Sequence, residues 1–300
     1  MTKQSIIGIP RASQFSPNHV GNDAAIFNGT ADYLRSHGYD VRICSEQEFL
    51  NMRENPEHVF TMLRSRQAML RLQEWEKKGC IAVNSATGIL NCERERMTAL
   101  LMQNNVPYPD SLIVNTDENV VDSLRQHGYK SCWIKRNDVH AIHREDVSYA
   151  RHPEEVQDML AEYALRGIRR VVINEHLEGD LVKFYGIAGS DFFYWFYPFS
   201  NENSHSKFGL EEINGKAREI PFDKDELHHI CQRAAEVLKL TVFGGDCIVS
   251  PDGSIRIIDF NDWPTFAPCR QEAVPEIGNA IIKAMTFRDS QMMMGHFSRS

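Results

Sequence analysis

The first ninety residues alternate between short apolar runs and segments with helical spacing. Apolar runs at residues 6–9 and 39–44 predict two strands, and residues 24–37 between them place apolar side chains on one helical face. A further helix is predicted over residues 64–77 and a third strand over residues 81–83. This order of strands and helices is typical of an open α/β domain, which we place at residues 1–92.

The rest of the chain predicts two α+β units and a short tail. The first, residues 93–178, opens with an amphipathic helix that prolines bring to an end. The second, residues 179–290, holds an aromatic-rich hairpin, a helix, an acidic hairpin and a closing helix, and residues 291–300 are expected to be frayed. The fold class is therefore α/β with α+β units, whose later elements are expected at residues 131–135, 147–150, 153–165, 170–175, 182–187, 191–197, 223–238 and 272–287.

The acidic hairpin is the most informative segment of the chain. Pro251-Asp252-Gly253 predicts a tight turn, and pairing the strands across it brings Asp246 close to Asp259 and Asn261. Two carboxylates and an amide suit Mg²⁺, which prefers oxygen ligands and usually keeps phosphate oxygens as well. The alternative is that the acidic residues only open a turn. The apolar character of both strands up to these residues favours a bound cation.

Composition narrows the classes of function. The chain has 300 residues, 42% hydrophobic and 25% charged, with a formal net charge of −8, which indicates a globular protein of more than one domain. No apolar run reaches the roughly 18 residues of a membrane span, and the first apolar segment is too short for a signal peptide, so a cytoplasmic protein is expected. The acidic balance argues against nucleic acid as a partner. Seven scattered cysteines favour buried thiols over disulfides or a zinc site.

Five segments, in chain order, resemble those of the ATP-grasp superfamily. They are residues 83–109, Trp133-Ile134-Lys135, residues 171–179, Val182-Lys183 and the acidic hairpin. The resemblance implies the ATP-grasp fold, in which an N-terminal open α/β domain is followed by two α+β subdomains that clasp ATP.

The resemblance also implies roles for individual residues. Asp246, Asp259 and Asn261 fall where the family places its magnesium ligands. Lys135 is similar to the lysine that contacts the α- and β-phosphates, and the basic side chain of Lys183 is expected to face phosphate or substrate. The residues implied in nucleotide binding are Arg94, Lys135, His143, Glu175, Leu177, Glu178 and Lys183, with Glu178 on the ribose hydroxyls.

These residues also have ordinary structural explanations. Lys135 could be a surface lysine, and Glu178 could belong to a hairpin turn. Lys183 sits in an apolar strand where an unpaired ammonium is costly, so it should meet a bound anion or form a salt bridge to Glu175 or Asp246.

Two features depart from the commonest pattern of the superfamily. Residues 136–146 contain no glycine, so side chains such as His140, His143 or Arg144 are expected to replace backbone amides at the phosphates, unless the loop is simply solvated. This loop resembles the inositol phosphate kinase branch. Asp259 also stands where most carboxylate–amine ligases of the family carry glutamate, and the shorter side chain still reaches a metal.

The segment from Arg11 to Asp23 follows the first strand at the carboxyl end of an open sheet, where ligands tend to bind. We interpret it as an acceptor-binding loop; the alternative is an ordinary connection. A highly phosphorylated acceptor would need a basic cluster, for which the candidates are Arg11, Arg64, Arg66, Arg94, Arg96, Arg136, Arg144 and Arg270. A carboxylate acceptor would need only one or two of them.

The resemblance predicts an enzyme that transfers the γ-phosphoryl group of Mg-ATP to a small anionic acceptor, with Lys183, Arg270 and His140 as catalytic residues. A carboxylate–amine or thiol ligase that forms an acyl phosphate is favoured, and a kinase that phosphorylates a hydroxyl is the alternative. A non-catalytic ATP-binding regulatory module fits less well, because the full set of charged residues is present. The expected cofactors are ATP and Mg²⁺, with Mn²⁺ as a substitute, and a homodimer is compatible with the family.

Overall fold

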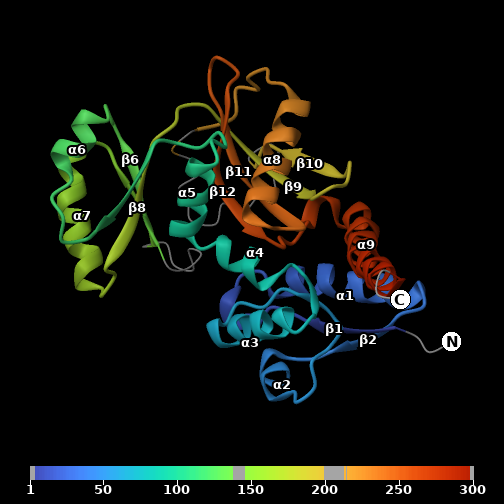
Figure 1. The fold of residues 1–300 in the computed structure, drawn as a ribbon. Coiled ribbons are helices and arrows are strands. Elements are labelled where there is room, and N and C mark those ends of the chain that lie inside the picture. The colour runs from blue at the N-terminus through green and yellow to red at the C-terminus, as the bar shows by residue number, and fades with distance from the viewer. Residues whose placement is uncertain (1–3, 138–145, 199–212, 214, 298–300) are drawn as a thin grey trace.

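The computed structural model describes residues 4–137, 146–198, 213 and 215–297, which contain three four-stranded sheets (Figure 1). The first domain is built on a parallel sheet with the strand order β2-β1-β3-β4. Its strands are β1 (Ser5–Ile9), β2 (Asp40–Ile43), β3 (His58–Thr61) and β4 (Ile81–Val83), joined by α1 (Val20–Ser36), α2 (Glu46–Asn51) and α3 (Arg66–Lys77). This order reverses between β1 and β3, so the domain has a switch point at the carboxyl ends of these two strands.

The sequence did not predict β3 or α2. All four residues of β3 are buried, so the strand lacks the alternation that marks a half-exposed strand. The short helix α2 is held by a capping box between Ser45 and Glu48. The open α/β class predicted for this part of the chain is confirmed.

The middle lobe is an antiparallel sheet with the strand order β5-β8-β6-β7. The helices α6 (Val121–Gln126) and α7 (Pro153–Leu165) cover its outer face, as Figure 1 shows. Leu124, Leu160 and Tyr163 from these helices pack in one core with Ile134 and Ile173 from the strands. The strands are β5 (Ser111–Asn115), β6 (Cys132–Arg136), β7 (Val147–Ala150) and β8 (Arg170–Glu175).

The C-terminal lobe is an antiparallel sheet with the strand order β10-β9-β11-β12. Its strands are β9 (Asp180–Ile187), β10 (Phe193–Phe196), β11 (Val242–Val249) and β12 (Ile255–Asp262). One face of the sheet packs against α8 (Lys224–Leu238) and also against α5 (Arg94–Gln103), which follows the short helix α4 (Ala86–Asn91). Met97 and Leu101 of α5 thus share a core with Phe184 of β9. The boundaries at 92, 178 and 290 stay predictions.

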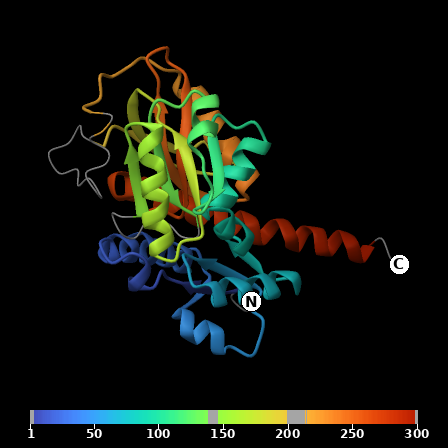
Figure 2. The same ribbon diagram turned by 90° about the vertical axis from the view of Figure 1, so that its left-hand side faces the viewer.

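The last helix, α9 (Arg270–Phe297), connects the C-terminal lobe with the first domain. Ile277 and Ile281 of α9 pack in one core with Ile26 and Phe27 of α1, and Trp263 at the end of β12 joins the same core. Figure 2 shows α9 extending beneath the lobes towards the C-terminus. The helix includes residues 291–297, which the sequence predicted to be frayed.

Among the described residues, no helix combines the length and the apolar character needed to cross a bilayer. All seven cysteines are free and buried, as predicted.

Asn84, directly after β4, ties the first domain to the C-terminal lobe. Its side chain is fully buried, and Oδ1 accepts hydrogen bonds from the backbone N–H groups of Thr241 and Val242, both at 2.8 Å. Nδ2 donates to the carbonyl oxygen of Val242 at 2.7 Å. One side chain therefore satisfies backbone groups at the start of β11.

We expect Asn84→Ala to lower the free energy of unfolding by about 2–4 kcal/mol, because it leaves buried N–H groups without an acceptor. Chemical denaturation followed by circular dichroism would measure the change. Asn91→Ala is the matched control, since Asn91 donates a single bond to the carbonyl of Leu238 at 3.1 Å and is only partly buried. Equal losses in the two variants would contradict the role given to Asn84.

Candidate active site

A cavity of about 570 Å³ lies where the middle lobe, the C-terminal lobe and the first domain meet. Its floor is the face of the C-terminal sheet that α5 and α8 leave uncovered. Strand register places the floor residues in rows: Leu181 beside Ile248, then Lys183 beside Asp246 and Asp259, then Tyr185 beside Gly244 and Asn261. The floor is thus apolar at one end, charged at its centre and aromatic at the other end.

The charged row, which we define as Lys183, Asp246 and Asp259, contains two of the three predicted metal ligands, and Asn261 lies in the next row. Asp246 on β11 stands opposite Asp259 on β12, as the turn at residues 251–253 predicted, and Asn261 Nδ2 donates to Asp259 Oδ2 at 3.3 Å. A bulge makes Ile258 an extra residue on β12, and both Ile258 and Asp259 line the cavity. Carboxylate and amide oxygens on one face fit a hard divalent cation.

Within the described residues, no three His, Cys, Asp or Glu side chains come close enough to hold a metal ion together. A cation at Asp246 and Asp259 would therefore need further oxygen ligands from phosphate or water, which is the usual situation for Mg²⁺.

Three cations surround the two aspartates. Lys183 Nζ lies 2.9 Å from Asp246 Oδ1, which is one of the two salt bridges expected for this lysine. Arg94, the first residue of α5, is only 6% exposed, and its Nη1 lies 3.0 Å from Asp259 Oδ1. Lys135 reaches in from β6 of the middle lobe. Three basic side chains therefore face two carboxylates in this part of the cavity.

Lys135 is a buried basic side chain whose pKa is shifted. It is 8% exposed, and its Nζ donates to the carbonyl oxygen of Ile258 at 3.2 Å, across the gap between the lobes. Burial, together with the positive charge of Arg94, lowers the pKa of Lys135 to about 7, against a smaller opposite effect of Asp259 and Asp246. The explanation of Lys135 as an ordinary surface lysine is therefore wrong.

The apolar end of the cavity suits a flat ring. Trp133 lies two residues before Lys135 on β6, so both line the cavity, together with Leu177, Leu181 and Ile258. Trp133 Nε1 donates to His176 Nδ1 at 3.0 Å. Burial lowers the pKa of His176, which favours the neutral ring that accepts this bond.

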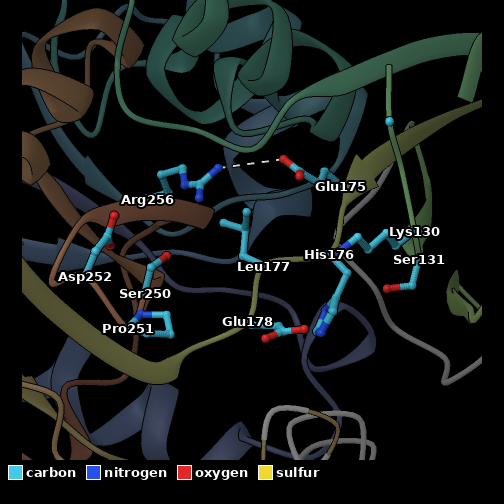
Figure 3. A pocket seen from close by; sticks show the side chains of 11 residues that line it. Lys130, Ser131, Glu175, His176, Leu177, Glu178, Ser250, Pro251, Asp252 and Arg256 are labelled. Carbon is cyan, nitrogen blue, oxygen red and sulfur yellow. Dashed lines mark ion pairs between the residues drawn. The ribbon is translucent and has the colours of Figure 1, made fainter. Parts of the chain in front are cut away.

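A smaller pocket of about 420 Å³ lies against the linker between β8 and β9, and Figure 3 shows His176, Leu177 and Glu178 of this linker in its lining. Glu175 and Leu177 line both spaces, and Arg256 Nη1 reaches Glu175 Oε2 at 3.7 Å. Glu178 lines the smaller pocket and is not among the described residues that line the larger cavity. Its predicted contact with ribose therefore lacks support from the geometry.

Two arginines extend the site into the first domain, at its switch point. Arg11 follows β1 and Arg64 follows β3. Arg11 Nη1 pairs with Asp23 Oδ1 at 3.0 Å, and Arg64 Nη1 pairs with Oδ1 of the buried Asp262. Arg11 also donates to the carbonyl oxygen of Trp263 at 3.0 Å, which locks this loop to the end of β12.

The predicted catalytic residues have different positions relative to the cavity. Lys183 lies in the charged row. Arg270 is not among the described residues that line the cavity, although its Nη2 donates to Oδ1 of Asn22, which does line it, at 2.9 Å. His140 and His143 lie outside the described residues, as does Arg144.

Comparison with solved structures identifies the architecture. D-alanine–D-alanine ligase from Bacillus anthracis, complexed with ATP, has a similar fold, with a TM-score of 0.69 and 14% identity over 97% of this chain and all of that chain. The ATP-grasp ligase PsnB, complexed with a minimal precursor, Mg and ADP, gives a TM-score of 0.63 with 17% identity over 95% of this chain and 99% of that one. The chain has the ATP-grasp fold.

A third structure with this fold, D-cycloserine synthetase DcsG, gives a TM-score of 0.66 with 13% identity over 93% of this chain and 99% of that chain. No protein-family profile matches the sequence, and no curated protein matches it significantly. The ATP-grasp fold expected from the five sequence segments is confirmed by these structures.

Several residues that line the cavity were not predicted as site residues, among them Trp133, Tyr185, Phe196 and Ile258. Trp133 and Tyr185 each lie two positions from a predicted lysine on the same strand, and the period of two in strands could have identified them. Ile258 could not be found this way, because the bulge changes the facing of residues on β12.

Proposed function

We propose that this chain is an enzyme that phosphorylates a small-molecule carboxylate with Mg-ATP, releases ADP, and then joins the acyl group to an amine or a thiol. The charged row carries the proposal. In one cavity it combines two aspartates that suit a magnesium ion with the cations Lys135, Arg94 and Lys183. The solved structures with this fold are of ligases in each case reported above, which favours the same class of reaction.

The reaction would proceed in two steps. An oxygen of the acceptor carboxylate attacks the γ-phosphorus of ATP, the bond from that phosphorus to the β–γ bridging oxygen breaks, and ADP leaves. The amine then attacks the acyl phosphate and loses a proton, and inorganic phosphate leaves. Bound at Asp246 and Asp259, Mg²⁺ would supply positive charge to the phosphate oxygens.

The residues of this chain have distinct tasks in this scheme. The adenine base of ATP would lie at the apolar end of the cavity, near Trp133 and Leu177. Its phosphates would then lie over the charged row. Lys135 and Arg94 are held by burial and would stabilise the phosphoryl group without moving far. Lys183 would exchange its contact with Asp246 for one with phosphate when the metal binds.

The pairing of the arginines favours a carboxylate acceptor over a highly phosphorylated one. Arg11, Arg64 and Arg94 each already contact an aspartate, so three of the candidates for a basic cluster are neutralised locally. A polyphosphorylated polyol would need more uncompensated positive charge than this.

The proposal is tested by ADP release from Mg-ATP across a panel of carboxylates and phosphorylated polyols, with and without hydroxylamine. We expect ADP release with a carboxylate and a hydroxamate that forms only when hydroxylamine traps the acyl phosphate. ADP release with a polyol, a stable phosphorylated product and no hydroxamate would make the chain a kinase instead. ATP binding without turnover on any acceptor would favour a regulatory module.

A further inference from the structure

We propose that the carboxylate acceptor of this enzyme is a monocarboxylic acid with an apolar, ring-sized body. This inference rests on the function proposed above, because it names the acceptor of that reaction. The body would lie at the aromatic end of the cavity, which we define as Tyr185, Phe196 and Pro264 together with Gly244.

The aromatic end has an apolar wall. The rings of Tyr185 and Phe196 lie 5.7 Å apart, and both side chains are only partly buried. Gly244 stands opposite Tyr185 on β11, and a Cβ there would lie 2.6 Å from Tyr185 Cδ1 and 2.7 Å from Pro264 Cγ. Glycine therefore lets Tyr185 and Pro264 pack closely over the backbone of β11, so these two side chains form an apolar surface of the cavity at this point.

The spacing from the charged row fits a compact acid. Tyr185 follows Lys183 by two residues on β9, which places it about 7 Å along the strand, and Phe196 on β10 stands opposite Lys183, so the aromatic end begins beside the charged row. The carboxylate must reach the γ-phosphate over that row. Its body then extends to the aromatic end if the ring or branched group is two or three bonds from the carboxyl carbon, as in 3-phenylpropanoate or phenylalanine.

The charges nearby argue against a second anionic group on the acceptor. Arg11 and Arg64 are the cations that the first domain brings to the cavity, and each is paired with a buried aspartate, Asp23 and Asp262 respectively. The neighbouring Arg64 also contributes, after burial, to lowering the pKa of Arg11, so the two cations already repel each other. Their aspartates balance them without a ligand, and the aromatic end keeps little net charge.

The test compares aromatic acids with small and dicarboxylic acids in the hydroxamate assay. We expect kcat/KM for 3-phenylpropanoate or phenylalanine to exceed that for propanoate, alanine and glutamate by about tenfold or more. Phe196→Ala should lower kcat/KM for the aromatic acids by about tenfold and so remove most of this advantage. Tyr194→Ala is the matched control, because Tyr194 neighbours Phe196 on β10 but does not line the cavity.

The outcomes separate this inference from the proposed function. Hydroxamate formation that favours glutamate or the small acids would overturn the aromatic acceptor and leave the ligase intact. An equal loss for all acids in Phe196→Ala would also overturn it. If no acid forms a hydroxamate, the aromatic site is tested by calorimetric titration of 3-phenylpropanoate into the protein with a non-hydrolysable ATP analogue. Binding that Phe196→Ala weakens tenfold would support the aromatic site. No binding would overturn it.

Discussion

Turnover of Mg-ATP is expected to fall by at least about a hundredfold in Asp259→Asn, since metal charge stabilisation is worth several kcal/mol and each 1.4 kcal/mol is about tenfold in rate. The amide keeps the size of the side chain and can still accept from Arg94 Nη1 and from the backbone N–H of Phe260, 3.1 Å away in the native protein. It loses the negative charge that would bind Mg²⁺. Coupled-enzyme detection of ADP at several magnesium concentrations would measure the effect.

Asp252→Asn is the control for this variant. Asp252 lies in the turn at the other end of the same hairpin, where it is exposed and bonds Ser254. We expect its turnover to match the native enzyme. If Asp259→Asn retained native turnover and native magnesium dependence while remaining folded, the metal assignment would be wrong.

Lys135→Met should lower turnover and raise the stability of the folded protein. The loss of a cation over the phosphates is expected to lower turnover by about a hundredfold, which is close to 3 kcal/mol. Burial holds the pKa of Lys135 near 7, below its unfolded value, so between about pH 7 and 10.5 the unfolded chain binds a proton that the folded protein does not. Stability of the native protein therefore falls as the pH drops through this window. The variant removes this cost, and its melting temperature without nucleotide should rise by about 2 °C for each kcal/mol regained.

Proton uptake separates this account from a simple packing effect. A bound polyphosphate favours the charged lysine, so nucleotide binding near pH 8 should raise the pKa of Lys135 and take up a proton. Calorimetry in two buffers with different ionisation enthalpies would detect the uptake in the native protein and its loss in Lys135→Met. Lys130→Met, at an exposed lysine before β6, should change neither quantity. Buffer-independent binding by the native protein would contradict the assigned role.

The sequence allowed prediction of features that depend on nearby residues. The turn at residues 251–253 defines the pairing of β11 and β12 because its three residues favour one geometry, so Asp246 and Asp259 could be placed together. The order of the five segments likewise identified the fold. These inferences succeed because turn geometry and strand alternation depend on residues that are close together in the sequence.

Features that depend on distant contacts could not be predicted. Arg64 and Asp262 pair across 198 positions, and β3, which delivers Arg64, has no alternation to mark it. The role of Glu178 at ribose stays a prediction, and in the structure Glu178 lines the smaller pocket beside the linker. Similarly, the apolar face of α5 does not reveal which sheet it will cover.

The two ends of the middle lobe, where the chain enters and leaves it, lie side by side. Ser111 pairs with Asn174 in the sheet, and the backbone N–H of Glu175 donates to the carbonyl oxygen of Asp110 at 2.9 Å. A segment whose two ends lie side by side can be exchanged for another of different size without separating its flanks. Residues 111–174 are thus a natural unit to exchange between proteins with the ATP-grasp fold. A chimera with this segment from another protein should keep the acceptor preference of the present chain and gain the nucleotide contacts of the inserted segment. The ion pair between Arg170 and Glu95 of α5 would have to be rebuilt in it.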